Sequence, residues 1–154
     1  MARRKTWSVS QEYFIDASPK KVFAMITDPD RLAKWMAFRA TISLRKGGKY
    51  TFTWRAGYHH EGKVLAFVRG KRITLAWPYH DGKKLLGVTK FQLAIRPKGK
   101  GTQVGLRHSG FPQTKEWLPI YAGSGAGWAY YMMNLKSVLE YGNDLRSKRD
   151  WMEA

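Results

Sequence analysis

The 154-residue sequence contains no cysteine and no long apolar run. Without cysteine the chain has no disulfide framework, no thiolate nucleophile and no cysteine-based metal site, which suits a reducing cytoplasm. No apolar stretch approaches the roughly 18 residues that a membrane-spanning helix needs. The basic start, MARRKTWSVS, also lacks the apolar segment of a signal peptide. We therefore expect a cytoplasmic protein with no membrane span.

Acidic residues are also scarce, because 11 Asp and Glu stand against 28 Lys and Arg, giving a formal net charge of +17. Such an excess attracts anions over long distances, so an acidic protein, a nucleic acid or an anionic lipid is a candidate partner. No RRM, KH or helix-turn-helix signature supports the nucleic acid. The alternative is a charged surface that only keeps the protein in solution.

Aromatic residues are abundant, at 14% of the chain with 7 Trp. They indicate either a large apolar interior or a stacking surface. No internal repeat, low-complexity tract or linker divides the sequence, and its length is sufficient to bury a sizeable core. Residues 1–154 are therefore expected to form a single domain.

The first third of the sequence changes from strand to helix periodicity. Residues 7–15 alternate in polarity, which predicts a half-buried strand. Ser18–Pro19 is then an N-cap followed by proline at the first helical position. Asp28–Pro29 ends this helix and begins a second short one.

From residue 38 to residue 109 the apolar pattern has a period of two, which predicts six antiparallel strands joined by short turns. The predicted strands cover residues 40–44, 49–54, 62–68, 71–79, 85–95 and 102–109. Alternate turns of such a meander fall at the same end of the sheet. Nine cations should therefore gather at one end: Arg45, Lys46, Lys49, Arg69, Lys71, Arg72, Arg96, Lys98 and Lys100.

The C-terminal part predicts one long helix. Apolar residues from Trp128 to Gly142 recur at spacings of three and four. The stretch 111–127 is ambiguous, and Gly123, Gly125 and Gly127 are expected to kink the helix or delay its start. Because the apolar face of the sheet needs a cover, we expect the sheet to curve around this helix.

Several motifs in this order carry a resemblance to a known family. They are SPKKVFAMITDPDRLAKWM (18–36), GGKYTFTW (47–54), EGKVLAFVRGKRITLAW (61–77), GTQVGLRHSGFP (101–112), and Gly127–Trp128 with NLKSVLEYGNDL (134–145). Together they resemble the START-like (SRPBCC) superfamily, in the branch similar to the C-terminal domain of the activator of the heat-shock protein 90 ATPase.

The resemblance implies an α+β helix-grip fold of the START/Bet v 1 type. It would have a curved antiparallel sheet of about seven strands around a long C-terminal helix, with two short helices after the first strand. It also implies a cavity between sheet and helix, which in the superfamily holds lipids, hormones or polyketides, or hosts cyclase chemistry. The fold alone does not fix the activity.

Flat aromatic side chains on three predicted strands share the parity of the buried face and should converge beneath the last helix. A pocket of this kind accepts a small apolar or aromatic ligand. The alternative is a packed core without a vacancy. The expected ligand-binding residues are Trp35, Phe52, Trp54, Trp77, Tyr79, Phe91, His108, Trp128, Tyr131 and Leu135.

His108 is the one weak candidate for a catalytic residue, because it stands next to Ser109 at the end of a predicted strand. Adjacent side chains on a strand point to opposite faces. His108 shares the parity of Val104 and Leu106 and should face inward, whereas Ser109 should face away. The two residues therefore make a poor base and nucleophile.

His59–His60–Glu61 suggests a metal site, but neighbouring residues diverge on a strand, and no second pair lies at metal-ligand spacing. We expect neither a metal nor another cofactor. The favoured function is non-catalytic binding of a small hydrophobic ligand by a monomer or homodimer. The alternatives are a chaperone-associated or other protein-partner module, and a cyclase- or dehydratase-type enzyme that uses the same cavity.

Overall fold

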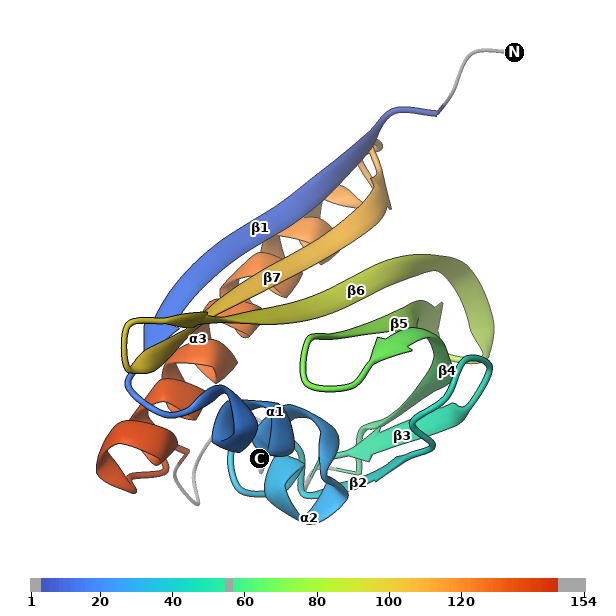
Figure 1. The fold of residues 1–154 in the computed structure, drawn as a ribbon. Helices are drawn as coiled ribbons and strands as arrows, with labels where there is room; N and C mark the ends of the chain where they lie inside the picture. The colour runs from blue at the N-terminus through green and yellow to red at the C-terminus, as the bar shows by residue number, and fades with distance from the viewer. Residues whose placement is uncertain (1–3, 55–56, 147–154) are drawn as a thin grey trace.

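The computed structural model describes residues 4–54 and 57–146. Figure 1 shows a curved sheet with a long helix across it and two short helices at one end. The elements in chain order are β1 (Thr6–Ile15), α1 (Pro19–Thr27), α2 (Pro29–Leu32), β2 (Arg39–Ile42), β3 (Lys49–Thr53), β4 (His59–Val68), β5 (Arg72–Asp81), β6 (Lys84–Lys98), β7 (Gly101–Pro112) and α3 (Leu118–Tyr141).

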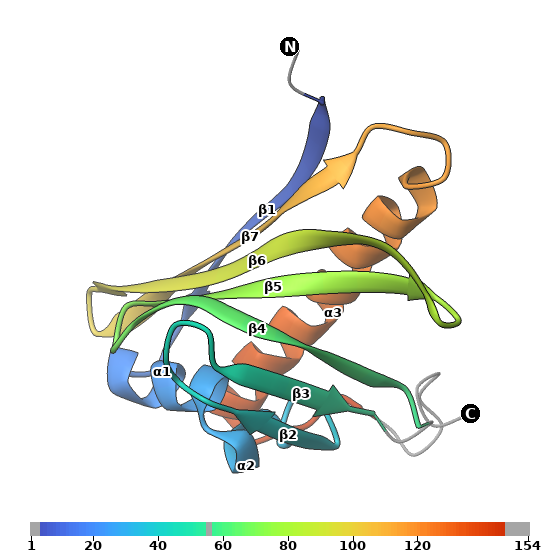
Figure 2. The ribbon, with the colours of Figure 1, turned by 90° about the vertical axis from the view of Figure 1, so that its right-hand side faces the viewer.

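The sheet has seven antiparallel strands in the order β1-β7-β6-β5-β4-β3-β2. Strands β2 to β7 form a meander, and β1 pairs with β7 at the edge. Figure 2 shows α3 running diagonally across one face of the sheet. The α+β helix-grip fold predicted from the sequence is therefore confirmed. Among the described residues, none of the helices has the length and apolar character required to cross a membrane.

The two short helices begin where their capping residues predict. The Ser18 side chain accepts a hydrogen bond from the Lys21 amide at 3.3 Å, with Pro19 in the first turn of α1. Asp28 caps α2 in the same way, accepting from the amide of Asp30 at 2.9 Å. Helix α1 lies at the end of the sheet where β6 turns into β7, and α2 lies beside β2 (Figure 2).

Helix α3 begins at Leu118, well before Trp128, so the prediction that the glycines delay its start was wrong. Tertiary packing outweighs their poor helix propensity here. Gly125 of α3 faces β1, and a Cβ built on this glycine would lie 3.7 Å from Val9 Cγ2. Nearby, the rings of Tyr121 and Trp7 stack with centroids 5.2 Å apart. The helix ends before Gly142, which has a left-handed φ of 67°.

Strand β4 begins at His59, three residues earlier than the predicted strand 62–68. His59, His60 and Glu61 therefore belong to the sheet and not to the preceding turn. His60 pairs across the sheet with Phe52 of β3. As alternation on a strand requires, His60 is buried while its two neighbours are exposed.

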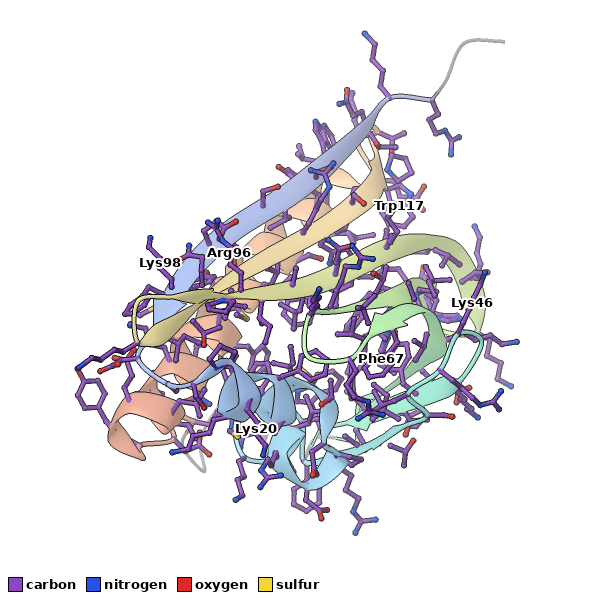
Figure 3. All side chains as sticks on the ribbon, viewed as in Figure 1. Lys20, Lys46, Phe67, Arg96, Lys98 and Trp117 are labelled. Atoms are coloured by element: carbon purple, nitrogen blue, oxygen red, sulfur yellow. The ribbon has the colours of Figure 1, made fainter. Side chains whose placement is uncertain are left out.

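Three turns bring basic residues to one end of the sheet, as the meander predicts. They are the β2–β3, β4–β5 and β6–β7 turns, which lie at the same side in Figure 2. Figure 3 shows that these cations are spread over the width of that end, with Arg96 and Lys98 on one side and Lys46 on the other. The charge therefore does not form one compact groove.

Candidate functional site

An aromatic pocket of about 350 Å³ opens between the N-terminal half of α3 and the ends of β3 and β5. Its described lining contains no charged side chain. The lining residues are Trp54, Tyr58, Trp77, Tyr79, Pro119, Ile120, Gly123, Ser124, Gly127, Trp128 and Tyr131. We refer to this space as the aromatic pocket.

Strand alternation and two glycines create the pocket. Trp77 and Tyr79 lie two residues apart on β5 and so project from the same face of the sheet. On the opposite wall, a Cβ built on Gly123 or Gly127 would meet no atom within 4 Å. The missing side chains of α3 leave the opening, and the rings of β5 form its inner wall.

A directed chain of hydrogen bonds supports the inner wall. The indole N–H of Trp128 can only donate, so His108 Nδ1 accepts its bond at 3.0 Å. The ring proton of His108 is therefore on Nε2, which donates to Thr89 Oγ1 at 2.6 Å. The Thr89 hydroxyl in turn donates to the Trp77 carbonyl at 2.8 Å. These three hydrogen bonds connect α3, β7, β6 and β5.

Burial keeps His108 neutral. This residue is fully buried, and burial lowers its pKa from 6.5 to about 3, with a smaller contribution from His60. Both ring nitrogens already have partners, and neither partner is a carboxylate. His108 faces inward, as its parity predicts, and Ser109 is only half-buried. His108 is therefore not placed to act as the base for Ser109 as a nucleophile.

A second buried histidine is fixed in the same manner. The Tyr50 hydroxyl donates to the Ala76 carbonyl at 2.6 Å and therefore accepts from His60 Nε2 at 2.8 Å. The His60 ring stacks on Trp77 at a centroid distance of 3.8 Å. Burial lowers the pKa of His60 to about 3 and raises that of Tyr50 above its usual value. In the part of the chain that the structure describes, no cluster of three metal-ligating side chains occurs.

Few polar atoms face the aromatic pocket. The Ser124 hydroxyl donates to the Ile120 carbonyl at 2.7 Å, so it accepts the hydroxyl proton of Tyr79. Burial raises the pKa of Tyr79 above its usual value, so the phenol stays protonated. Trp54 Nε1 is buried and has no hydrogen-bond partner among the described residues. Such an orphaned donor is uncommon in a folded protein.

The centre of the molecule is nearly filled. An interior void of about 20 Å³ lies between sheet and helices, enough for a water molecule but not for an organic ligand. Stacking of Trp128 on Phe91, with centroids 4.2 Å apart, occupies much of this space. The accessible volume therefore lies beside α3 and not beneath its middle.

The expected ligand-binding residues separate into three groups. Those at the aromatic pocket are Trp54, Trp77, Tyr79, Trp128 and Tyr131. Those at the interior void are Trp35, Phe52, Phe91 and again Trp128. His108 and Leu135 line neither space and are fully buried.

Sequence reasoning missed the groups that complete this region. Thr89 has the same parity as Phe91, and His60 the same as Val64, so alternation alone could have placed both residues inside. Gly123 and Ser124 were missed because the stretch before Trp128 was ambiguous. No signal in the sequence indicates that Thr89 would accept a bond from His108.

A seven-stranded antiparallel sheet that wraps a long C-terminal helix, with an aromatic pocket beside that helix, defines a helix-grip protein of the START-like class. Residues 16–140 match the model of the family described as activator of Hsp90 ATPase homolog 1-like protein, and the chain belongs to this family. No curated protein gives a significant sequence match.

Solved structures share the fold at low sequence identity. Protein MLL2253 from Mesorhizobium loti is 21% identical with a TM-score of 0.77, over 89% of this chain and 99% of that one. The Aha1 dimer from Colwellia psychrerythraea is 24% identical with a TM-score of 0.73, over 89% and 98%. DynU16, from the dynemicin biosynthetic locus, is 19% identical with a TM-score of 0.76, over 91% and 49%.

Proposed function

We propose that this protein binds a small, uncharged, flat apolar molecule in the aromatic pocket and does not transform it. The observation that carries the proposal is the pocket itself, in which indole and phenol rings from the connection between β3 and β4, from β5 and from α3 surround about 350 Å³. This volume is within the range of about 300–1,000 Å³ that is typical of small-molecule sites.

The chemistry of the lining supports a neutral ligand. No charged side chain is among the described lining residues, so an ionised ligand would lose hydration without gaining an ion pair. The Trp77 and Trp128 rings meet edge to face, with centroids 5.2 Å apart, and together give the inner wall a continuous aromatic surface.

Among the described residues of this region, neither His108 nor Tyr79 is placed to act as an acid or a base. His108 lies behind the pocket wall with both nitrogens engaged, and its lowered pKa makes it a weak base. The Tyr79 phenol has a raised pKa and donates to Ser124. These features favour binding over a cyclase or dehydratase reaction. That a structural relative belongs to a biosynthetic locus fits a small-molecule ligand.

The test is a titration of a set of flat molecules matched in size, one neutral, one carboxylated and one aminated, followed by intrinsic tryptophan fluorescence. Several indoles line the pocket, so occupancy should quench their emission. We expect saturable quenching by the neutral compound and at least tenfold weaker binding of both charged analogues. Equal affinity for all three, or no saturable change with any neutral aromatic compound, would contradict the proposal.

A second candidate function is docking of an acidic protein partner, such as an ATPase chaperone. It is supported by the exposed cations at the turn end of the sheet, among which Arg69, Lys71 and Arg72 form no ion pair with a described acidic residue. The electrostatic attraction of such charges for an acidic partner weakens as the salt concentration rises. Co-sedimentation with the host chaperone at low and high salt tests it, and association that is absent at both excludes it.

A further inference from the structure

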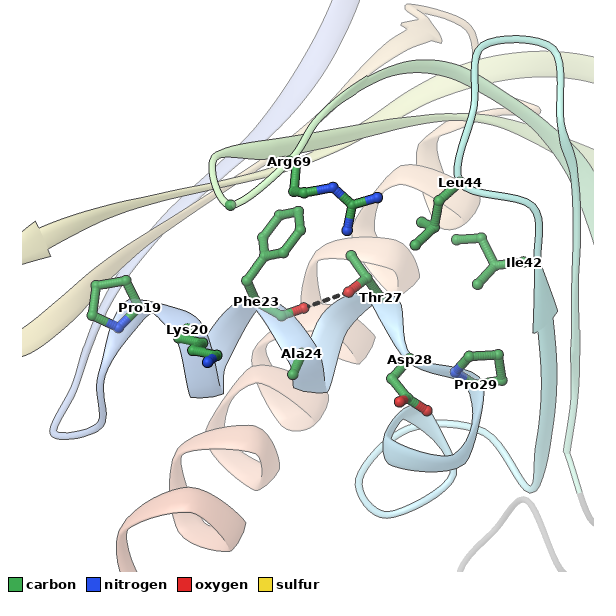
Figure 4. A pocket seen from close by; sticks show the side chains of 11 residues that line it. Pro19, Lys20, Phe23, Ala24, Thr27, Asp28, Pro29, Ile42, Leu44 and Arg69 are labelled. Carbon is green, nitrogen blue, oxygen red and sulfur yellow. Dashed lines mark hydrogen bonds between the residues drawn. The ribbon is translucent and has the colours of Figure 1, made fainter.

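A second pocket lies at the other end of the sheet, between α1 and the β2–β3 and β4–β5 turns (Figure 4). Its volume is about 650 Å³. We refer to it as the α1 pocket. It is separate from the aromatic pocket, since the two spaces have no lining residue in common.

The walls of the α1 pocket are apolar. They include Pro19, Phe23, Ala24, Pro29, Ile42 and Leu44. Thr27 also presents an apolar surface, because its hydroxyl donates to the Phe23 carbonyl of its own helix at 2.7 Å, as the dashed line in Figure 4 shows. A tail of methylene groups could therefore lie against these walls without facing an unsatisfied polar group.

The charged groups at this pocket are not balanced. Asp28 already accepts hydrogen bonds from the Asp30 amide and from the Arg31 side chain, at 2.9 and 3.2 Å. In contrast, Lys20 and Arg69 are exposed and form no ion pair with any acidic residue that the structure describes. The pocket thus combines an apolar wall with two cations that form no ion pair with a described acidic residue.

Arg69 is positioned over the opening. Figure 4 shows its side chain reaching from the β4–β5 turn toward Thr27. Its guanidinium carbon lies 5.5 Å from the centroid of the Phe67 ring, and this ring contacts Phe23 at 5.9 Å. The ring contact favours a position of Arg69 beside the apolar wall, and its planar guanidinium can bind a carboxylate through two hydrogen bonds.

We propose that the α1 pocket binds a small amphiphile with one oxyanion head and an apolar tail, the head at Arg69 and Lys20 and the tail against α1. The ligand differs in charge from the neutral molecule proposed for the aromatic pocket. The turn cations at Arg45, Lys46 and Lys71 add a positive field at the same end and would raise the rate of encounter.

The experiment uses decanoate, decanol and decyltrimethylammonium below their micellar concentrations, which share one tail and differ in head charge. Binding is followed by amide chemical shifts in NMR spectra of the full chain. We expect decanoate to shift the amides of Phe23, Thr27 and Gly70, and to leave those of Gly123 and Gly127 unchanged. Similar affinity for all three compounds, or shifts confined to α3, would overturn the proposal.

Two variants separate a specific head contact from general attraction. Arg69→Gln should weaken decanoate binding by about tenfold, the loss expected for one charge-assisted hydrogen bond. Arg96→Gln removes the same charge at the same end of the sheet but outside the pocket, and should leave the affinity within about twofold. An equal effect of both substitutions would overturn the proposal.

A third variant tests the wall. Ala24→Leu extends a side chain from α1 into the pocket and should weaken decanoate binding, while circular dichroism verifies that the helix content is retained.

Binding to phosphatidylglycerol vesicles without any shift of α1 amides by free decanoate would identify the surface as a membrane contact and also overturn the proposal. A negative result for the α1 pocket does not contradict the proposal for the aromatic pocket, because that proposal is tested with a neutral ligand and a different readout.

Discussion

Trp128 and His108 are joined by a hydrogen bond of 3.0 Å between the indole N–H and Nδ1, which fixes the long helix to strand β7 inside the core. This bond determines the histidine tautomer and thereby the direction of the bonds that follow through Thr89 to Trp77. Since the same indole also lines the aromatic pocket, the shape of the site depends on a polar contact behind it.

Replacing Trp128 with phenylalanine should therefore destabilise the protein. The substitution leaves His108 Nδ1 buried without a donor, at a cost of about 1–3 kcal/mol in the free energy of unfolding. Trp54→Phe is the matched control, because the indole N–H that it removes has no partner among the described residues. Urea unfolding should show a loss for Trp128→Phe and a change within about 1 kcal/mol for Trp54→Phe. Equal losses would show that the hydrogen bond contributes little.

Stability should decrease in mild acid. His60 and His108 have folded-state pKa values lowered from 6.5 to about 3, so the unfolded chain takes up protons that the folded chain does not. Stability is then fully present above pH 6.5 and decreases below it, by about 1.4 kcal/mol per pH unit for each histidine. Urea unfolding at pH 7.5 and pH 5 measures this loss.

An NMR titration of the imidazole resonances checks the cause of that loss directly. Neither ring should change its chemical shift between about pH 8 and pH 5, because both stay neutral while the protein is folded. A midpoint near the usual value for His108 or His60 would show that the ring reaches water and would remove the basis of the pH prediction.

Two glycines should respond to alanine in opposite directions. A Cβ on Gly62 would lie 2.5 Å from the Ala76 carbonyl oxygen, the atom that accepts the Tyr50 hydroxyl, so Gly62→Ala should destabilise by about 1–3 kcal/mol. In α3 a Cβ on Gly123 meets nothing, so Gly123→Ala should stabilise by about 0.5–1 kcal/mol. Thermal unfolding of the two variants compares them, and changes of the same sign would contradict the structure.

The aromatic pocket can be closed from the helix. Gly127→Leu places a side chain in the opening and should abolish quenching by the neutral ligand, because it fills the volume between α3 and β5. Ala126→Leu is the control, since this neighbouring position is exposed and does not line the pocket. Fluorescence titration of both variants measures the effect. Normal binding by Gly127→Leu would locate the ligand elsewhere.

Much of the architecture could be predicted because it follows from local periodicity. Alternation gave the strands and the inward orientation of His108, and Ser18 and Asp28 marked the helix starts. The start of α3 could not be predicted, because the contacts that support it exist only in the folded protein: the Gln11 side-chain amide donates to the Gly125 carbonyl at 3.0 Å, and Tyr121 stacks on Trp7.

The sequence predicted which residue types form the candidate site, but not where an open cavity lies among them. Trp77, Tyr79 and Trp128 were placed on the correct faces, yet parity does not say whether rings fill a cavity or border one. Stacking of Trp128 on Phe91 closes the centre and leaves the opening beside α3. The α1 pocket was missed because it depends on a helix and two turns that are distant in sequence.

Ile42 borders both the α1 pocket and the interior void, and Trp128 borders both that void and the aromatic pocket. The interior void therefore lies between the two openings, with Ile42 on one side and Trp128 on the other. Replacing both residues with smaller ones would enlarge this void toward both openings.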